Sequence, residues 1–122
     1  MEKIILEGTE DTPKIILDAQ NKIFEISGRS LPEDCAQFYK PIVSWLEAYT
    51  GTGEMNFIIK LDYFNTASSK LILDILTRLE RIKDKGVDVK VLWYFQEDDE
   101  DMQEAGEEFS ELVEVPFEIK EY

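Results

Sequence analysis

The sequence contains no histidine among its 122 residues. Histidine is the usual general base at neutral pH and a common ligand of zinc and haem, so its absence removes the Ser-His and Cys-His nucleophile pairs. Cys35 is the only cysteine, which excludes an internal disulfide bond and a thiolate metal cluster. The sequence therefore disfavours nucleophilic hydrolases and zinc or haem proteins, and we expect no bound cofactor.

Long apolar runs and basic residues are also scarce. No apolar run approaches the roughly 20 residues of a membrane helix, and the apolar stretch at the start is too short for a signal peptide. The 27 acidic and 13 basic residues give a net charge of −14, which repels a phosphate backbone. These features predict one cytoplasmic domain over residues 1–122, with neither a membrane nor a nucleic acid as partner.

The negative charge is concentrated near the C-terminus. Residues 97–122 hold 12 acids and one base, and the densest part is the run 97–101. Such a run is typical of a solvated loop that leads into a helix, since carboxylates suit a helix N-terminus. The pattern of a calcium loop fails, because Gly106 lies too far from the aspartates for the sixth-position turn. A docking surface for a basic partner remains the second interpretation.

Short apolar runs predict the strands. Residues 14–18 and 22–26 read as a β-hairpin, and residues 57–61 as a central strand buried on both faces. Alternation predicts further strands over 87–94 and 113–119. Pro116 cannot donate to a ladder, so the last strand should lie at an edge of the sheet.

Helical periodicity predicts three helices between these strands. Ser30 with Glu33 resembles a capping box at the start of the first helix, whose apolar stripe runs from Cys35 to Tyr49. A kink or a local break is expected at Pro41, which falls inside this helix. A second helix follows residues 62–69, and a third spans 101–112. Its stripe comprises Met102, Ala105, Phe109 and Leu112. The alternation predicts an α/β domain with a mixed, mostly parallel sheet, about three helices and an N-terminal β-hairpin.

The loop after Leu61 is the candidate site, because ligands bind at the carboxyl ends of parallel strands. It carries Asn65, Thr66, Ser68 and Ser69 where the second helix begins, and free backbone N–H groups there favour an anion or a covalent phosphate. Simple helix capping accounts for the same residue types. The loop lacks the glycines and the Gly-Lys-Ser/Thr ending of a P-loop.

Residues 58–76 resemble the SiaC-type regulatory phosphoproteins, a bacterial family long known only as a domain of unknown function. The likeness covers nearly the whole chain. It includes residues 7–13, 30–33 and 107–109, together with Trp45, Pro116 and Phe117. The Asn65-Thr66 step with the two following serines is its most specific part. The architecture also resembles STAS domains, in which a phosphorylatable hydroxyl begins the helix after a central strand.

The resemblance implies a non-catalytic signalling phosphoswitch. In this family a dedicated kinase phosphorylates the threonine after the asparagine and a metal-dependent phosphatase removes the phosphate. The unmodified form binds an effector, such as a diguanylate cyclase that it activates. The corresponding acceptor here is Thr66, with Ser68 as backup because Ala67 departs from the pattern. The partner surface implied around the acceptor comprises Tyr63, Phe64, Asn65, Ser69 and Lys70.

Two other functions stay open at this point. One is an enzyme in which carboxylates such as Asp62 and Asp74 hold a metal, although their spacing gives no reason for them to converge. The other is a constitutive acidic interaction module. The sequence does not name the effector, and charge alone permits a phosphate that either prevents or promotes binding. Trp45 and Trp93 are interpreted as core residues.

Overall fold

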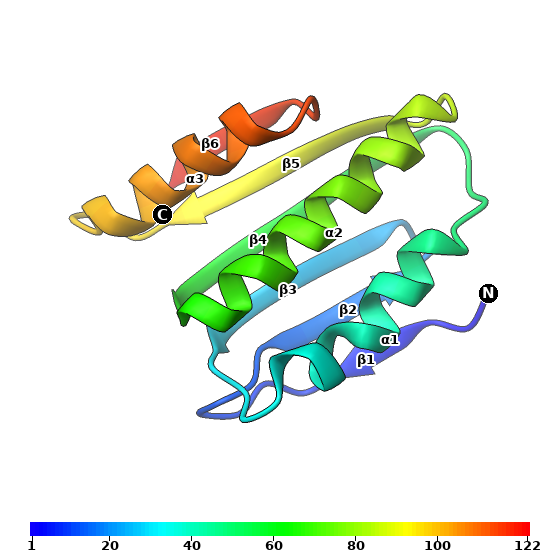
Figure 1. Cartoon of the computed structure of the whole chain (residues 1–122). Helices are drawn as coiled ribbons and strands as arrows, with labels where there is room; N and C mark the ends of the chain where they lie inside the picture. The colour runs from blue at the N-terminus through cyan, green and yellow to red at the C-terminus, as the bar shows by residue number, and fades with distance from the viewer.

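One six-stranded sheet runs through the computed structural model, which covers residues 1–122. Its strands, in spatial as in sequence order, are β1 (Ile4–Leu6), β2 (Lys14–Asp18), β3 (Ile23–Ser30), β4 (Glu54–Phe64), β5 (Asp88–Phe95) and β6 (Phe117–Glu121). The helices are α1 (Cys35–Glu47), α2 (Thr66–Asp84) and α3 (Glu100–Leu112) (Figure 1). The first three strands pair antiparallel and the last four parallel, which confirms the predicted α/β class.

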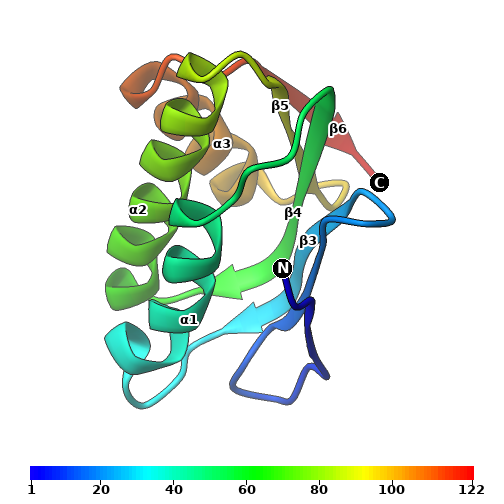
Figure 2. The ribbon, with the colours of Figure 1, turned by 90° about the vertical axis from the view of Figure 1, so that its right-hand side faces the viewer.

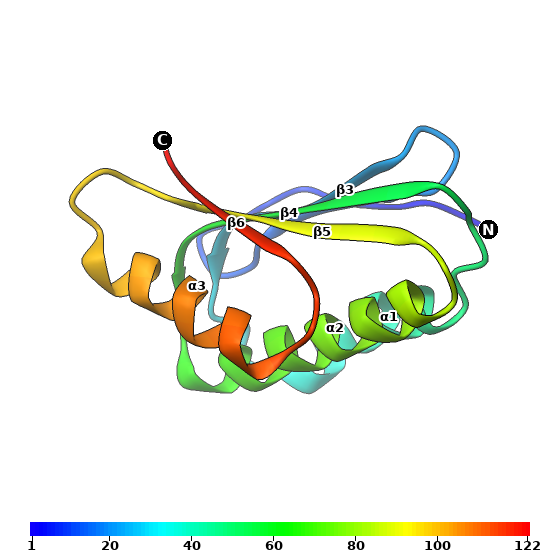
Figure 3. The same ribbon diagram turned by 90° about the horizontal axis from the view of Figure 1, so that it is seen from above.

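All three helices cover the same face of the sheet, and the opposite face carries none (Figure 2; Figure 3). In β4 the side chains of Phe57, Ile59 and Leu61 are buried beneath the helices, while Asn56 is exposed and Lys60 half-buried. The prediction that residues 57–61 are buried on both faces is therefore wrong. Ile58 lies on the open face and is only half-buried. A continuous apolar run therefore does not require that both faces of the strand be covered.

The N-terminal hairpin is confirmed, since β2 and β3 pair antiparallel from Lys14 with Ser27 to Asp18 with Ile23. The sequence pattern missed β1, which pairs with β2 and forms one edge of the sheet. Its three residues are too few for a detectable alternation.

The first helix begins at Cys35, with Asp34 as its N-cap. The predicted capping box of Ser30 and Glu33 is wrong, because the alternation of β3 continues to Ser30 and buries that residue beneath the helices. The helix also runs without interruption through Pro41, where we expected a kink or a local break.

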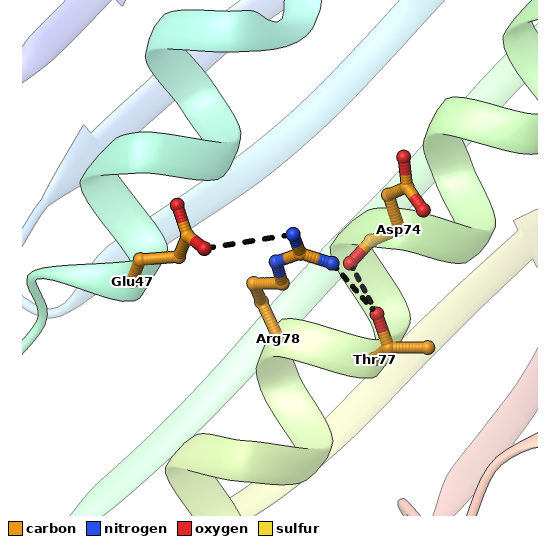
Figure 4. A network of polar contacts seen from close by, with 4 residues as sticks. All are labelled: Glu47, Asp74, Thr77 and Arg78. Carbon is orange, nitrogen blue, oxygen red and sulfur yellow. Dashed lines mark hydrogen bonds and ion pairs between the residues drawn. The ribbon is translucent and has the colours of Figure 1, made fainter.

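A polar network joins α1 to α2 (Figure 4). The Arg78 guanidinium lies 3.5 Å from a Glu47 carboxylate oxygen and donates to the Thr77 hydroxyl at 3.2 Å. Thr77 in turn donates to the carbonyl of Asp74 at 2.8 Å. These contacts add to an apolar interface in which buried residues of both helices belong to one core cluster.

The third helix packs on β5 and β6, apart from the α1–α2 pair (Figure 1). Met102 and Phe109 are buried as predicted, but Leu112 is 65% exposed, so its place in the buried stripe was wrong. The predicted strand over 113–119 begins only at Phe117, and it does lie at an edge. No helix has both the length and the apolar character needed to cross a membrane.

Candidate functional site

Thr66 is the first residue of α2 and its side chain is exposed. The preceding residue, Asn65, is the N-cap, and its side-chain oxygen accepts from the backbone N–H of Ser68 at 2.8 Å. The strand β4 ends one residue earlier, at Phe64. The threonine hydroxyl is therefore presented to solvent at the carboxyl end of a parallel strand and at the positive end of a 19-residue helix.

A buried polar network fixes the backbone beneath Thr66. The Tyr39 hydroxyl and the Ser30 hydroxyl are 2.5 Å apart, and Ser30 donates to the Ser68 hydroxyl at 2.9 Å. Ser68 donates back to the Ser30 carbonyl at 2.9 Å, and the same carbonyl accepts the backbone N–H of Asn65 at 3.1 Å. The network ties the first turn of α2 to β3 and, through Tyr39, to α1, so the turn that carries Thr66 is held by two other elements.

Ser68 is completely buried within this network. A kinase requires an accessible hydroxyl, and Ser68 could offer one only after the first turn of α2 opened. Its burial argues against Ser68 as the backup acceptor and gives it a structural role. Sequence reasoning missed this role because Ser30 and Ser68 lie 38 positions apart, and only the pairing of β3 with β4 brings them together.

Burial raises the pKa of the Tyr39 phenol to about 12, and the hydrogen bond with Ser30 lowers it by less. Because the pKa in the unfolded chain is near 10, the stability from neutral Tyr39 is complete below pH 10 and is lost as pH rises toward 12. We expect the free energy of unfolding of the wild type, relative to Tyr39→Phe, to fall by about 1.4 kcal/mol per pH unit in that window. Urea denaturation between pH 8 and 11.5 measures this difference, and parallel curves for the two proteins would refute it.

The other predicted partner residues surround the start of α2. Tyr63 is 48% exposed and its ring lies against the Arg29 guanidinium, 5.6 Å from the ring centroid. Phe64 is half-buried, with its ring 6.4 Å from Trp93 and 6.2 Å from Phe109. Lys70 is exposed on α2. The structure thus brings these residues to one end of the sheet.

Two hollows lie along α3, one facing the end of β4 and the other the start of α2, and they share Phe64. One, of about 200 Å³, is lined by Asp62, Tyr63, Phe64, Asp99, Asp101 and Met102. The other, of about 210 Å³, is lined by Phe64, Ser69, Ala105, Glu108, Phe109 and Leu112. We refer to these residues together as the α2–α3 groove. It begins within one helical turn of Thr66, since Ser69 belongs to it.

The carboxylates of the α2–α3 groove have no cationic partner. The ion pairs of the chain join Arg78 to Glu47, and both Lys90 and Lys120 to Glu118, all outside the groove. Asp62 accepts hydrogen bonds only from uncharged groups of Gln96 and Tyr122.

The acidic run 97–101 is a loop leading into a helix, as predicted. Asp99 is the N-cap of α3 and accepts from the backbone N–H of Met102 at 3.0 Å. Glu100 and Asp101 occupy the first turn, where the helix dipole favours carboxylates. What the sequence did not show is that this run lies beside the C-terminal end of β4. The available signal was that β4 and β5 are consecutive parallel strands, whose carboxyl ends meet at one edge.

The carboxylates considered for a metal enzyme do not form a cluster. Asp62 lies in the groove, whereas Asp74 is exposed two turns into α2, beside Thr77 and Arg78 (Figure 4). No group of three or more Cys, Asp or Glu side chains is placed to hold a metal ion. Trp93 is completely buried and Trp45 nearly so, which confirms both as core residues.

Comparisons with known proteins agree with this geometry. A family model described as "SiaC family regulatory phosphoprotein" matches residues 6–122. An uncharacterised protein of Pseudomonas aeruginosa (strain UCBPP-PA14) is 31% identical over 98% of this chain and 97% of its own length. The solved structure of SiaC of P. aeruginosa is similar over the whole of both chains, with 30% identity and a TM-score of 0.90. SiaC in its crystal complex with the diguanylate cyclase SiaD, which it activates, matches with 30% identity and a TM-score of 0.90, over 98% of this chain and 99% of SiaC.

Proposed function

Because the chain belongs to the SiaC family of regulatory phosphoproteins, we propose that it is a non-catalytic phosphoswitch controlled at Thr66. Its unmodified form binds and regulates an effector such as a diguanylate cyclase. A partner kinase phosphorylates Thr66 and ends this binding, and a phosphatase restores it. Kinase and cyclase both consume cytoplasmic nucleotides, so the proposal places the chain in the cytoplasm.

The observation that carries the proposal is the contrast between the hydroxyl groups at the start of α2. Thr66 is exposed, whereas Ser68 is completely buried and Ser69 half-buried. A kinase can therefore reach Thr66 without unfolding the helix. The complex of the similar protein SiaC with a diguanylate cyclase supports the choice of effector.

The fold tolerates a phosphate on Thr66. The modification adds roughly −1.5 to −2 charges at neutral pH, and a helix N-terminus favours negative charge by about 0.3–1 kcal/mol. The network of Ser30, Tyr39 and Ser68 holds the turn from the other side and does not involve the Thr66 side chain. Phosphorylation thus changes the surface and leaves the shape of the domain unchanged.

A constitutive interaction module is the second candidate. The unpaired carboxylates of the α2–α3 groove favour it, because they offer an acidic surface with or without phosphate. The two candidates differ in one respect. A constitutive module binds its effector equally well before and after treatment with a kinase.

The proposal is tested with the purified chain and the diguanylate cyclases encoded in the same genome. We expect one of them to form a stable complex with the unmodified chain and to convert GTP to cyclic di-GMP several-fold faster in its presence. The chain alone should convert no GTP. Light scattering coupled to gel filtration detects the complex, and product chromatography measures the rate. If none of these cyclases binds or changes its rate, the proposed class of effector is wrong.

A further inference from the structure

The α2–α3 groove combines an apolar floor with an acidic rim. Phe64 and Phe109 form the floor, and the exposed Leu112 lies at one end. Asp62, Asp99, Asp101 and Glu108 line the same two hollows, and no cation of the chain pairs with them. Exposed apolar surface next to unpaired charge of one sign is typical of an interface whose partner carries the opposite charge.

The length of α3 along the groove suits a helical partner. From Asp101 to Leu112 the wall is formed by α3, which rises about 16 Å over those eleven steps, or three helical turns. A partner helix laid along this wall would place one apolar stripe on the floor and a basic stripe along the rim.

We propose that the α2–α3 groove binds a basic amphipathic helix of the effector. Lysine or arginine side chains of that helix lie against Asp101 and Glu108, and its apolar side chains contact Phe64 and Leu112. This inference rests on the proposed function in that it places the effector next to Thr66. It goes beyond that function by naming the surface and the chemistry of the segment that binds there.

The acidity of the groove also determines how the phosphate acts. A basic helix is attracted by negative charge, so charge repulsion does not account for release. The phosphate weakens binding because it places a bulky hydrated group within one turn of Ser69, at the edge of the apolar floor. Raising the salt concentration should therefore weaken binding of both forms, while the ratio between their affinities persists.

A model peptide tests the groove without any effector. The isotope-labelled chain is titrated with a synthetic 14-residue helix of leucine and lysine in an amphipathic pattern, and with its leucine–glutamate counterpart. We expect the basic peptide to shift the backbone NMR signals of Phe64, Ala105 and Leu112, and the acidic peptide to shift none. Shifts confined to the open face of the sheet, or no shifts at all, would overturn the proposal. Concentration-dependent shifts of the groove without peptide would assign it to a second copy of the chain instead.

Charge-reversal variants provide the matched control. Asp101→Lys with Glu108→Lys alters two groove carboxylates seven positions apart. Glu104→Lys with Glu111→Lys changes the same charge at the same spacing on the same helix, at exposed positions outside the groove. We expect the first pair to weaken peptide binding at least tenfold and the second to change it less than twofold. Equal losses of peptide affinity in the two double variants would show that the net charge of the chain alone attracts the peptide, and would exclude the groove as its binding site. If the peptide binds as expected but no cyclase does, the groove is confirmed as a site for a basic helix and the proposed class of effector is wrong.

Discussion

We expect phosphorylation of Thr66 to weaken binding of the proposed effector by about thirtyfold or more, and Thr66→Asp to reproduce most of that loss. The added hydrated group displaces one well-placed contact of the interface, and losing such a contact costs about 2 kcal/mol of binding free energy. Removing water from the added charge costs further free energy. Thr66→Ala should keep the unmodified affinity within about twofold and should no longer be a substrate of the kinase. Titration calorimetry of the unmodified, phosphorylated and substituted chains against the effector measures these differences.

Thr52→Asp is the matched control for the Thr66 variants. Thr52 is also an exposed threonine, but it precedes β4 and so lies at the opposite end of the sheet from Thr66. Its replacement adds the same charge and should leave affinity unchanged. Equal affinities of the phosphorylated and unmodified chains would remove the switch, and tighter binding of the phosphorylated chain would reverse its sign. Phosphate found on Ser69 and absent from Thr66 would move the site.

We expect Gly106→Ala to lower the free energy of unfolding by about 1–3 kcal/mol, although alanine is the better helix former by about 1 kcal/mol. A Cβ atom at this position would lie 2.5 Å from Cδ1 and 2.7 Å from Nε1 of Trp93. Trp93 cannot move aside, because it is completely buried and its indole N–H donates to the Met102 carbonyl at 2.9 Å. The third helix must therefore shift away from β5.

Thermal or urea denaturation measures this loss, and Glu107→Ala is the control. Glu107 is the next residue of α3 and is exposed, so its replacement should change stability by less than about 0.5 kcal/mol. A Gly106→Ala protein as stable as the wild type would show that α3 does not need its close contact with Trp93. A weakened effector affinity in the same variant is also expected, because α3 forms one wall of the groove.

The core-facing residues were largely predictable from periodicity. The alternation of β5 and the apolar stripes of α1 and α2 are local patterns. Such a pattern is enough to predict which face of a strand or helix is buried. The errors occurred where a distant element decided the outcome. Ser30 reads as a helix cap by its local sequence, yet it ends β3 because Tyr39 and Ser68 satisfy its hydroxyl there.

Leu112 and β4 illustrate the same limit. Leu112 continues the helical stripe of α3, but the helix ends there and no element of the chain covers it. Strand β4 has the composition of a strand buried on both faces, but each helix crosses on the same side of the sheet, so its other face is open. The pattern of apolar residues along the sequence shows which side chains favour burial. The arrangement of the helices and strands decides which of those side chains are covered by another element.

Local sequence patterns predicted the α/β class, the three helices and five of the six strands, because each depends on contacts between near neighbours in the chain. The expected turn over residues 62–69 is instead the end of β4 and the first turn of α2, which carries the hydroxyl groups. The sequence also determined the excess of negative charge near the C-terminus. The exposure of Thr66, the burial of Ser68 and the position of the acidic run beside Phe64 follow from how the folded elements pack. These features arise where the carboxyl ends of parallel strands lie side by side, although tens of residues separate the strands in the sequence. No local sequence pattern predicts which side chains meet at those ends.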